Sequence, residues 1–190
     1  MNQRTYIDFL NKIEKLKCNT RHSWTSSGRQ ESVAEHSWRL AVMAMLCADE
    51  YPEHDINKVI KMCLIHDFGE AITGDIPAFL KTDDHKKTES EAIDFLCDLI
   101  PEAGLSTLFE EMREMKTPEA KLCKALDNLE AVISHNETDL STWTELEFDL
   151  NLTYGEDTVT SYFGLRSIAY RDHAGSHVPQ KIQGKQTSFS

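Results

Sequence analysis

Two histidines and two aspartates in this chain have the side-chain chemistry of a site for a divalent cation. They are His36, His66, Asp67 and Asp127. Neutral imidazole nitrogen and anionic carboxylate oxygen together suit an ion of intermediate hardness, and four such ligands leave coordination positions open for water. A bound divalent ion lowers the pKa of water from about 15.7 to roughly 7–9, so hydroxide becomes available near neutral pH. The set therefore indicates hydrolysis by an activated water molecule.

Each of these residues also has an ordinary structural explanation. A single histidine on an apolar helix face is most often a hydrogen-bonded core residue, and a single inward aspartate more often caps a neighbouring helix. The dipeptide His66-Asp67 is also compatible with the end of an ordinary helix. A metal site is therefore predicted only if separate helices turn all four side chains toward one point.

The helix that carries His36 has a clear start in the sequence. Ser32 and Glu35 form a capping box, in which the hydroxyl and the carboxylate satisfy free N–H groups of the first turn. Steps of three and four residues then connect Val33, His36, Leu40, Met43 and Cys47. We therefore expect His36 to face the core, on a helix that ends near Tyr51-Pro52.

A second helix is expected to begin near Asp55 and to carry His66. Steps of three and four residues connect Ile56, Val59, Cys63 and His66. His66 therefore points inward, Asp67 lies about 100° around the helix from it, and Glu70 follows one turn later on the His66 side. The segment 74–77, GDIP, is expected to be a loop.

A third helix supplies the last aspartate. Thr117 has the side chain of an N-cap, and Pro118 suits the first helical position. The helix is expected to run to about His135, with a stripe of small residues formed by Ala120, Cys123, Asp127 and Ala131. Asp127 is thus predicted to face the interior.

The other segments are mostly helical in pattern. Helices are expected at about 1–17, 105–115 and 156–170, whereas 143–148 is either helical or irregular. For the acidic stretch 81–91, we expect a solvated turn that leads into a helix capped by Thr88 and Glu91. The end of the chain, 173–190, is rich in Gly, Ser, Gln and Lys, and we expect a disordered tail there.

The composition favours one all-α domain over residues 1–172. The 190 residues include only eight Gly and five Pro, and charged residues alternate with Leu, Met and Ala, which is typical of helices rather than of a turn-rich β-sandwich. The formal net charge is −12, and no dense cluster of Lys and Arg is present. A nucleic acid polymer is therefore disfavoured as a partner, because its phosphates need a basic surface.

Cysteine usage and hydropathy bear on the cellular compartment. The five cysteines at positions 18, 47, 63, 97 and 123 contain no CxxC pair, so we expect reduced, mostly buried thiols rather than a disulfide framework or a thiolate zinc site. We expect neither a membrane span nor an export signal, because the first residues form an amphipathic pattern with mixed charges. A cytoplasmic location follows as an expectation.

Three segments, taken together, resemble a known family. They are RQESVAEHSWRLA at 29–41, CLIHDFGEAITGDIP at 63–77 and KALDNLEA at 124–131. The order His, then His-Asp, then Asp on separate helices resembles the HD-domain phosphohydrolase superfamily, and within it the bacterial 5'-deoxynucleotidase-like subfamily. The resemblance runs from about Lys15 to Tyr170. It implies a single-domain helical HD-domain fold, one divalent ion such as Mn, Co, Mg or Fe, and a homodimer.

The resemblance also implies roles for individual residues. His36, His66, Asp67 and Asp127 match the metal ligands of the superfamily. Glu70 matches a carboxylate that takes part in proton transfer. The resemblance therefore implies catalytic roles for Glu70 and for Asp67, which is also one of the metal ligands it implies.

Substrate-binding roles are implied for four other positions. Arg21 matches an arginine that orients the substrate phosphate, although a surface ion pair is an alternative. Asp75 matches a residue of the nucleotide-binding loop, and a role as a cap of that loop is the alternative. The subfamily has Trp directly after the arginine, whereas this chain has His22 there and Trp24 two places later. His22 and Trp24 are therefore candidates for contact with the base, or else ordinary core residues.

The resulting prediction is a phosphohydrolase that removes the 5'-phosphate from a (deoxy)ribonucleoside monophosphate. A deoxynucleoside triphosphate triphosphohydrolase is one alternative, for which the extra cations would come from Arg29, Arg39, Lys81, Lys86 and Lys87. A nucleotide-binding module without turnover is another alternative. His135 lies two turns beyond Asp127 and receives no role.

Overall fold

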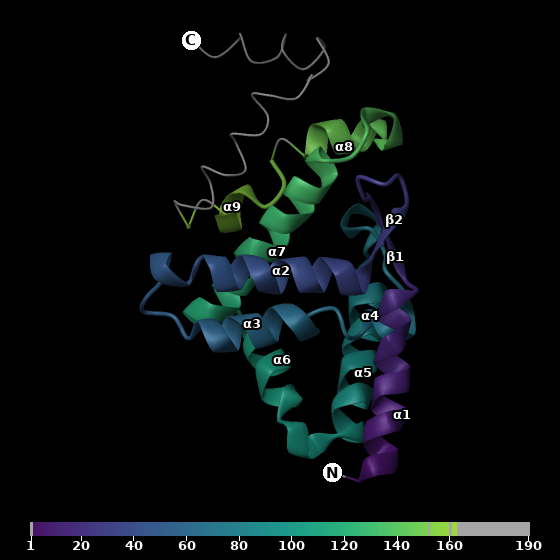
Figure 1. The fold of residues 1–190 in the computed structure, drawn as a ribbon, viewed down its shortest axis with the longest axis vertical. Helices are drawn as coiled ribbons and strands as arrows, with labels where there is room; N and C mark the ends of the chain where they lie inside the picture. Colours follow the sequence, from purple (N-terminus) through teal and green to yellow (C-terminus); the bar gives the residue numbers. More distant parts are fainter. Residues whose placement is uncertain (1, 152, 160, 163–190) are drawn as a thin grey trace.

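The computed structural model describes residues 2–151, 153–159 and 161–162, and helices make up most of this part of the chain (Figure 1). The predicted all-α class is confirmed. No helix in the described residues is long and apolar enough to cross a membrane. The predicted tail at 173–190 lies outside the described residues.

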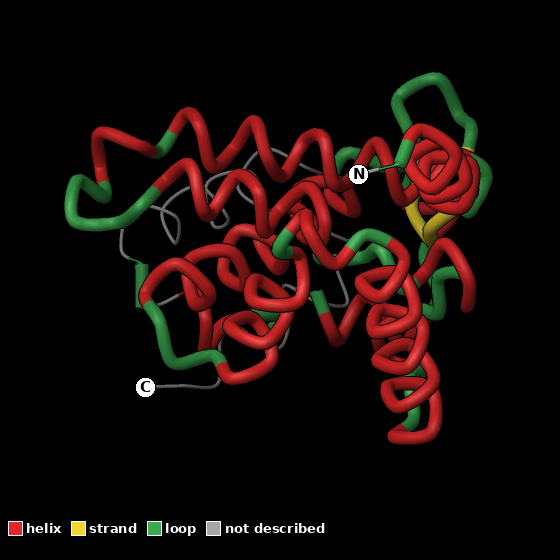
Figure 2. Tube along the Cα trace, turned by 90° about the horizontal axis from the view of Figure 1, so that it is seen from below, coloured by secondary structure: helices red, strands yellow, loops and turns green. Residues whose placement is uncertain are grey.

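A small β-hairpin in the described residues departs from helical structure, and the sequence patterns do not predict it. Strands β1 (Thr20–Trp24) and β2 (Gln30–Ser32) pair in antiparallel fashion, with Thr20 opposite Ser32 and an irregularity before Trp24. The hairpin is visible as the short yellow segment in Figure 2. It has no long alternation of apolar and polar residues, so its pattern is weak. Its importance is positional, because β1 carries the side chain of Arg21.

Three helices form the main core and carry the four candidate ligands. Helices α2 (Val33–Leu46) and α3 (Ile56–Ile65) pack side by side, and α7 (Pro118–Asn136) crosses both of them (Figure 1). The three helices share one buried apolar cluster, which includes Leu40, Val59, Met62, Leu122, Leu126 and Leu129. The bulky apolar layer fixes the rotation of each helix, and this rotation decides which polar side chains meet.

The predicted starts of these three helices agree with the structure. Ser32 caps α2 in a capping box with Glu35, Asp55 caps α3, and Thr117 caps α7 with Pro118 in the first turn. The end predicted for α2 near Tyr51-Pro52 is too late. The α-helix ends at Leu46, and a short 3-10 turn, Ala48–Glu50, completes the segment.

A second group of helices packs at the other end of the molecule. It comprises α1 (Gln3–Ile13), α4 (Glu70–Thr73), α5 (Asp83–Leu99) and α6 (Leu105–Glu114). Phe9 of α1, Leu96 and Ile100 form one buried cluster, and Phe109 of α6 joins Ile65 and Ile93 in another.

The predicted start of α5 is wrong. The helix is capped by Thr82 rather than by Thr88, and the side chain of His85 returns to the Thr82 backbone in place of a glutamate. The stretch read as a solvated turn is therefore the first two turns of α5. Residues 82–88 are exposed although they belong to the helix or its cap, and Glu89 and Ser90 are partly buried.

The chain finishes with two short helices near the end of α7. Helix α8 (Glu145–Leu150) overlaps the segment 143–148, predicted as helical or irregular, and extends two residues beyond it. Helix α9 (Glu156–Val159) begins where a helix was expected. The rest of the helix predicted to reach residue 170 lies outside the described residues, apart from 161–162. Asn128 of α7 donates a hydrogen bond to the hydroxyl of Thr158, which ties α9 to the core.

Candidate metal centre and active site

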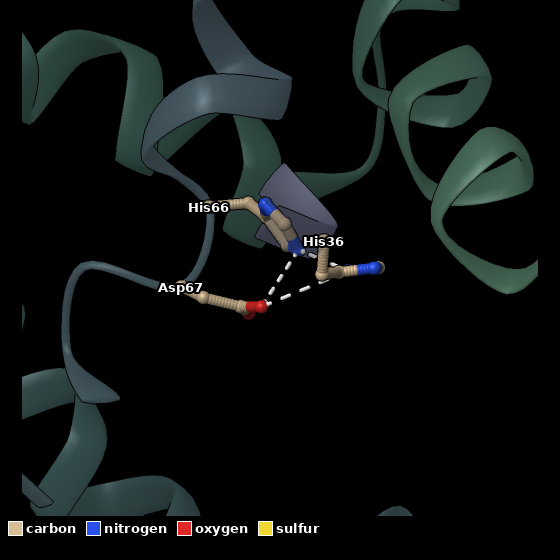
Figure 3. Close-up of side chains that lie close together, drawn as sticks. All are labelled: His36, His66 and Asp67. Carbon is tan, nitrogen blue, oxygen red and sulfur yellow. Dashed lines mark hydrogen bonds and ion pairs between the residues drawn. The ribbon is translucent and has the colours of Figure 1, made fainter. Parts of the chain in front are cut away.

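The histidine and aspartate side chains of α2 and of the turn after α3 point toward one another (Figure 3). The Nε2 atoms of His36 and His66 are 3.3 Å apart. The Oδ2 atom of Asp67 lies 3.0 Å from Nε2 of His66 and 3.8 Å from Nε2 of His36. Three potential ligand atoms from two elements therefore surround one point.

Asp127 of α7 completes the group. Its Oδ1 atom is 3.2 Å from Nε2 of His36 and 3.7 Å from Nε2 of His66. Its other oxygen, Oδ2, accepts a hydrogen bond of 2.7 Å from Lys124, which lies one turn earlier on the same helix. The structure thus brings together the four residues that the sequence separates by 91 positions, from His36 to Asp127.

The local backbone explains how two consecutive residues both reach this point. Helix α3 ends at Ile65, and His66 is its C-cap, with the N–H of His66 still bonded to the carbonyl of Met62. The next bond, from the N–H of Phe68 to the carbonyl of Ile65, spans three residues rather than four. This tighter turn changes the direction of Asp67 relative to a continuing α-helix.

Both histidines use their Nδ1 atoms elsewhere, which leaves both Nε2 atoms for the centre. Nδ1 of His66 donates to the carbonyl oxygen of Cys63 at 2.9 Å. Nδ1 of His36 is hydrogen-bonded to the carboxylate of Glu130, which is fully buried. Because an acceptor holds the proton on each Nδ1, a neutral ring at either position presents a lone pair on Nε2.

The electrostatics of this group favour a cation. Burial alone would lower the pKa of His66, but Asp67 and Asp127 outweigh it and raise that pKa well above its usual value. Burial would raise the pKa of Asp127, but Lys124 and the two histidines lower it well below its usual range. Two lone pairs and two carboxylates packed this closely require positive charge between them. These residues therefore fit a divalent metal ion, which would replace the protons.

Three of the four candidate ligands, His66, Asp67 and Asp127, line a cavity of about 640 Å³, and His36 is fully buried. This volume is within the usual range for small-molecule sites, roughly 300–1,000 Å³. Charged side chains that line the cavity include Arg21, Asp67, Glu70, Asp75, Lys81 and Asp127. A cation site and a space for a small ligand therefore adjoin.

Arg21 lies in this cavity as an incompletely paired cation. Its Nε atom is 3.8 Å from Oε2 of Glu31, which is an ion-pair distance but too long for a hydrogen bond. Its side chain is 18% exposed, and no hydrogen bond from its guanidinium occurs among the described residues. Burial would lower the pKa of Arg21, but Asp67, Glu130 and Asp127 raise it. The guanidinium is therefore charged and has N–H donors free for a ligand.

Glu70 is a buried carboxyl group that also lines this cavity. It begins α4 and is 3% exposed. Burial is the main cause that raises its pKa, with Asp67 and Asp75 adding to the effect, and the pKa reaches about 8. Lys81 lies 3.3 Å from Oε1 of Glu70 and 2.9 Å from Glu89. Glu70 is thus mostly protonated at neutral pH and is suited to donate a proton.

Of the other three candidates for substrate binding, two line the cavity and one does not. Asp75 lines the cavity, and burial raises its pKa although Arg21 acts in the opposite direction. His22 also lines the cavity, where its Nε2 lies 3.1 Å from Oε1 of Glu147. Trp24 is not among the lining residues; its ring makes an edge contact with His22, with centroids 4.9 Å apart. Any contact of Trp24 with a ligand in this cavity would need a rearrangement.

The residues proposed for a triphosphate are mostly elsewhere. Only Lys81 of this group lines the cavity. Arg29 pairs with Glu35, Arg39 with Glu137, Lys86 with Asp83, and Lys87 with Glu91. The cavity is instead lined by Lys81 together with Arg21, Arg113 and Lys124. Lys81, Arg113 and Lys124 are each in an ion pair with a carboxylate of this chain, which leaves fewer free cations than a triphosphate needs.

Sequence reasoning missed two polar elements of the site. Glu130 supports His36 from one turn after Asp127 on α7, and the spacing D-x-x-E in KALDNLEA is the only signal for it. Glu147 of α8 lines the cavity between His22 and His135, at 3.9 Å from Nε2 of His135. No local pattern predicts Glu147, because tertiary packing brings α8 to the cavity.

The cysteines are free thiols, as expected. Four of them are buried and only Cys18 is exposed. Cys63 and Cys123 face each other across α3 and α7, with their sulfur atoms 3.8 Å apart. None of the five is within the group of candidate ligands described above.

Comparison with known proteins agrees with this geometry. The HD domain family model matches residues 13–163. The human 5'-deoxynucleotidase HDDC2 is 35% identical over 142 residues, which span 70% of this chain and 68% of the human one. The 5'-deoxynucleotidase hdd1 of Schizosaccharomyces pombe is 30% identical over 157 residues, which span 73% of this chain and 78% of the yeast one.

A solved structure of a similar protein has the same fold. The crystal structure of a predicted metal-dependent phosphohydrolase from Magnetospirillum magnetotacticum MS-1 has a TM-score of 0.68 and 30% identity, and the match covers 90% of this chain and 93% of that one. Sequence, fold and the arrangement of histidine and aspartate side chains all agree, and the chain belongs to the HD-domain family.

Proposed function

We propose that this protein is a metal-dependent phosphohydrolase that removes the 5'-phosphate from deoxyribonucleoside monophosphates. The observation that carries the proposal is the meeting of two imidazole Nε2 atoms, 3.3 Å apart, with one oxygen of each of two carboxylates at 3.0–3.8 Å from these nitrogens. Three of these four side chains line a cavity that Arg21 and Glu70 also line. The names of the human and yeast relatives support the 5'-deoxynucleotide as substrate.

One divalent cation would be held by His36, His66, Asp67 and Asp127. It would supply Lewis-acid activation of water and of the phosphate at this position. Mixed nitrogen and oxygen ligands discriminate poorly among first-row ions, so Mn, Co, Mg and Fe are all candidates. The role of the protein is to hold the ligand atoms at one end of the cavity in fixed protonation states.

Arg21 would bind the phosphate. Its planar guanidinium offers paired N–H donors that match two phosphate oxygens, and it makes no competing hydrogen bond among the described residues. The negative charge that the substrate brings would offset the positive charge of Arg21. The carboxylates nearby, Asp67 first among them, raise the pKa of Arg21 against the effect of burial and keep the guanidinium charged.

Glu70 would act as the general acid. When water attacks phosphorus, the bond from phosphorus to the 5'-oxygen breaks, and the leaving oxygen needs a proton. Glu70, with a pKa of about 8, holds that proton at neutral pH. Lys81 contacts the carboxyl group from the loop side and would stabilise the carboxylate once the proton has left.

The nucleoside would lie toward Asp75 and His22. Asp75 has no hydrogen bond or ion pair among the described residues, so its carboxylate is available to a sugar hydroxyl. His22 is held by Glu147 and presents its ring to the cavity. Trp24 would support the ring of His22, unless substrate binding rearranges β1. We also infer a homodimer and a cytoplasmic location, which light scattering and cell fractionation would check.

Phosphate release separates this proposal from its alternatives. We expect inorganic phosphate and nucleoside from dAMP in the presence of Mn²⁺, Co²⁺ or Mg²⁺, and none after the metal is removed with a chelator. Release of triphosphate from dATP, with no turnover of dAMP, would instead support a triphosphohydrolase. Thermal stabilisation by nucleotides without release of any phosphate would support a binding module.

A further inference from the structure

We propose that Glu130 is a positioning residue that fixes the ring orientation and the tautomer of His36, and so sets the affinity of the centre for its metal. The inference rests on the proposed metal-dependent function. It concerns a residue that does not reach the cavity. Glu130 is 0% exposed and lies one turn after Asp127 on the inner face of α7.

The contacts of Glu130 account for both of its oxygen atoms. Oε2 is hydrogen-bonded to Nδ1 of His36, and Oε1 accepts a hydrogen bond of 2.6 Å from the hydroxyl of Ser134. The Nε atom of Arg39 lies 3.8 Å from Oε1. These contacts hold the buried carboxylate in place, because a rotation would break hydrogen bonds and leave buried polar atoms unpaired.

This arrangement determines what His36 can do. A carboxylate accepts but does not donate, so the proton of neutral His36 must lie on Nδ1. Nε2 is then a lone-pair donor, directed at Nε2 of His66 and Oδ1 of Asp127, at 3.3 and 3.2 Å. A negative partner on Nδ1 also makes the ring a stronger electron donor. Glu130 therefore prepares His36 for a cation before any cation arrives.

The second histidine is supported differently. Nδ1 of His66 donates to a neutral backbone carbonyl, that of Cys63, at 2.9 Å. A substitution cannot remove this carbonyl, whereas Glu130 is a side chain whose charge can be deleted without touching a ligand. The chain thus offers a direct way to ask what the charge behind one imidazole contributes.

The orientation of Glu130 is supported from the surface. Arg39 is on the same helix as His36, and its two terminal nitrogens bind Glu137 at 2.7 and 2.9 Å. Glu137 is at the C-terminus of α7, and its side chain is 56% exposed. It is a natural control, because it is a carboxylate on the same network that does not contact His36.

The test is the dissociation constant for Mn²⁺, measured by calorimetry on metal-free protein. We expect Glu130→Gln, which keeps the shape and an acceptor oxygen, to weaken binding by ~10-fold, and Glu130→Ala to weaken it by up to ~100-fold. Glu137→Gln should stay within about two-fold of the parent protein, as expected for an exposed ion pair. Circular dichroism of each metal-free variant shows that the fold is retained.

A spectroscopic readout separates positioning from a general structural effect. In the zinc-loaded protein with ¹⁵N-labelled histidine, we expect a strongly downfield proton on Nδ1 of His36, which moves upfield in Glu130→Gln and is lost in Glu130→Ala. Wild-type affinity in both variants, with an unchanged Nδ1 proton, would overturn the inference and leave the proposed function intact. Absence of metal binding by the parent protein itself would instead overturn the proposed function.

Discussion

The two sides of the cavity differ in how their charges are paired. On the ligand side, formed by His36, His66, Asp67 and Asp127, each side chain contacts another member of the set, and Glu130 and Lys124 support it from behind. On the substrate side, formed by Arg21, Glu70 and Asp75, neither Arg21 nor Asp75 has a hydrogen bond among the described residues. One side is complete except for a cation, and the other is open to a ligand.

The difference follows from the elements that build each side. The ligand side is formed where α2, α3 and α7 share a close-packed apolar core, so its geometry is as rigid as the packing. The substrate side belongs to a two-stranded hairpin, a four-residue helix and a loop with Gly74 at a φ of 77°. Rigid helices suit a metal site, and short elements suit a site that must accept and release a substrate.

The largest expected effect comes from breaking the ligand side. Asp67→Ala removes a carboxylate that lies 3.0 Å from Nε2 of His66 and that we propose as a ligand, so it should abolish both cation binding and turnover. The loss of activity should exceed the ~10²–10⁴-fold typical of an acid–base residue. Elemental analysis after dialysis against Mn²⁺ provides the measurement. A normal metal content in this variant would mean that Asp67 is not a ligand.

Removal of the proton donor should affect chemistry without affecting the cation. Glu70→Gln keeps the size of the side chain but cannot transfer a proton, so kcat should fall by ~10²–10⁴-fold while the metal content stays normal. Steady-state kinetics and elemental analysis on the same sample make the comparison. A kcat close to that of the parent protein would remove Glu70 from the mechanism.

A smaller effect is expected at Arg21. Arg21→Lys keeps the charge but loses the paired donors, so kcat/KM for dAMP should fall by ~10–100-fold, as for one charge-assisted hydrogen bond. Metal affinity should change little, because Arg21 is not a ligand. Arg29→Lys, at an exposed ion pair with Glu35, is a matched control and should be unaffected. Equal activity of both variants would contradict the phosphate-binding role.

The smallest expected effect is on stability. Glu70 has a usual pKa of 4.5 and a pKa of about 8 in the folded protein, so the folded state holds a proton that the unfolded state has lost. The protonated Glu70 therefore contributes to the stability of the folded protein below pH ~4.5, and this contribution is lost as the pH rises toward about 8. In metal-free protein, the free energy of unfolding of Glu70→Gln should therefore rise relative to that of the parent protein by on the order of 1–3 kcal/mol as the pH goes from 5 to 8. Urea titrations at several pH values measure the free energy of unfolding of both proteins. If the two proteins showed the same dependence of this free energy on pH, a raised pKa of Glu70 would be contradicted.

Local patterns predict the ligand side better than the substrate side. His36, His66 and Asp127 could be assigned inward because capping residues and apolar spacing fix the start and the rotation of a helix. The same reasoning misplaced the start of α5, since Thr82 with His85 and Thr88 with Glu91 both fit a helix start. Only the contacts of Thr82 in the fold separate them.

The remaining features depend on contacts between distant segments. Nothing near Glu147 indicates that α8 would bring it to the cavity beside His22. Glu130 has the spacing of a residue on the Asp127 face, but its role requires the position of α2, which is 94 residues away at His36. The hairpin that carries Arg21 has too few residues for a periodic signal.

The most direct test is anomalous diffraction from a crystal soaked in Mn²⁺. We predict one strong manganese peak, in contact with Nε2 of His36, Nε2 of His66 and the carboxylates of Asp67 and Asp127. A manganese peak elsewhere, or these four side chains directed to separate places, would contradict the account.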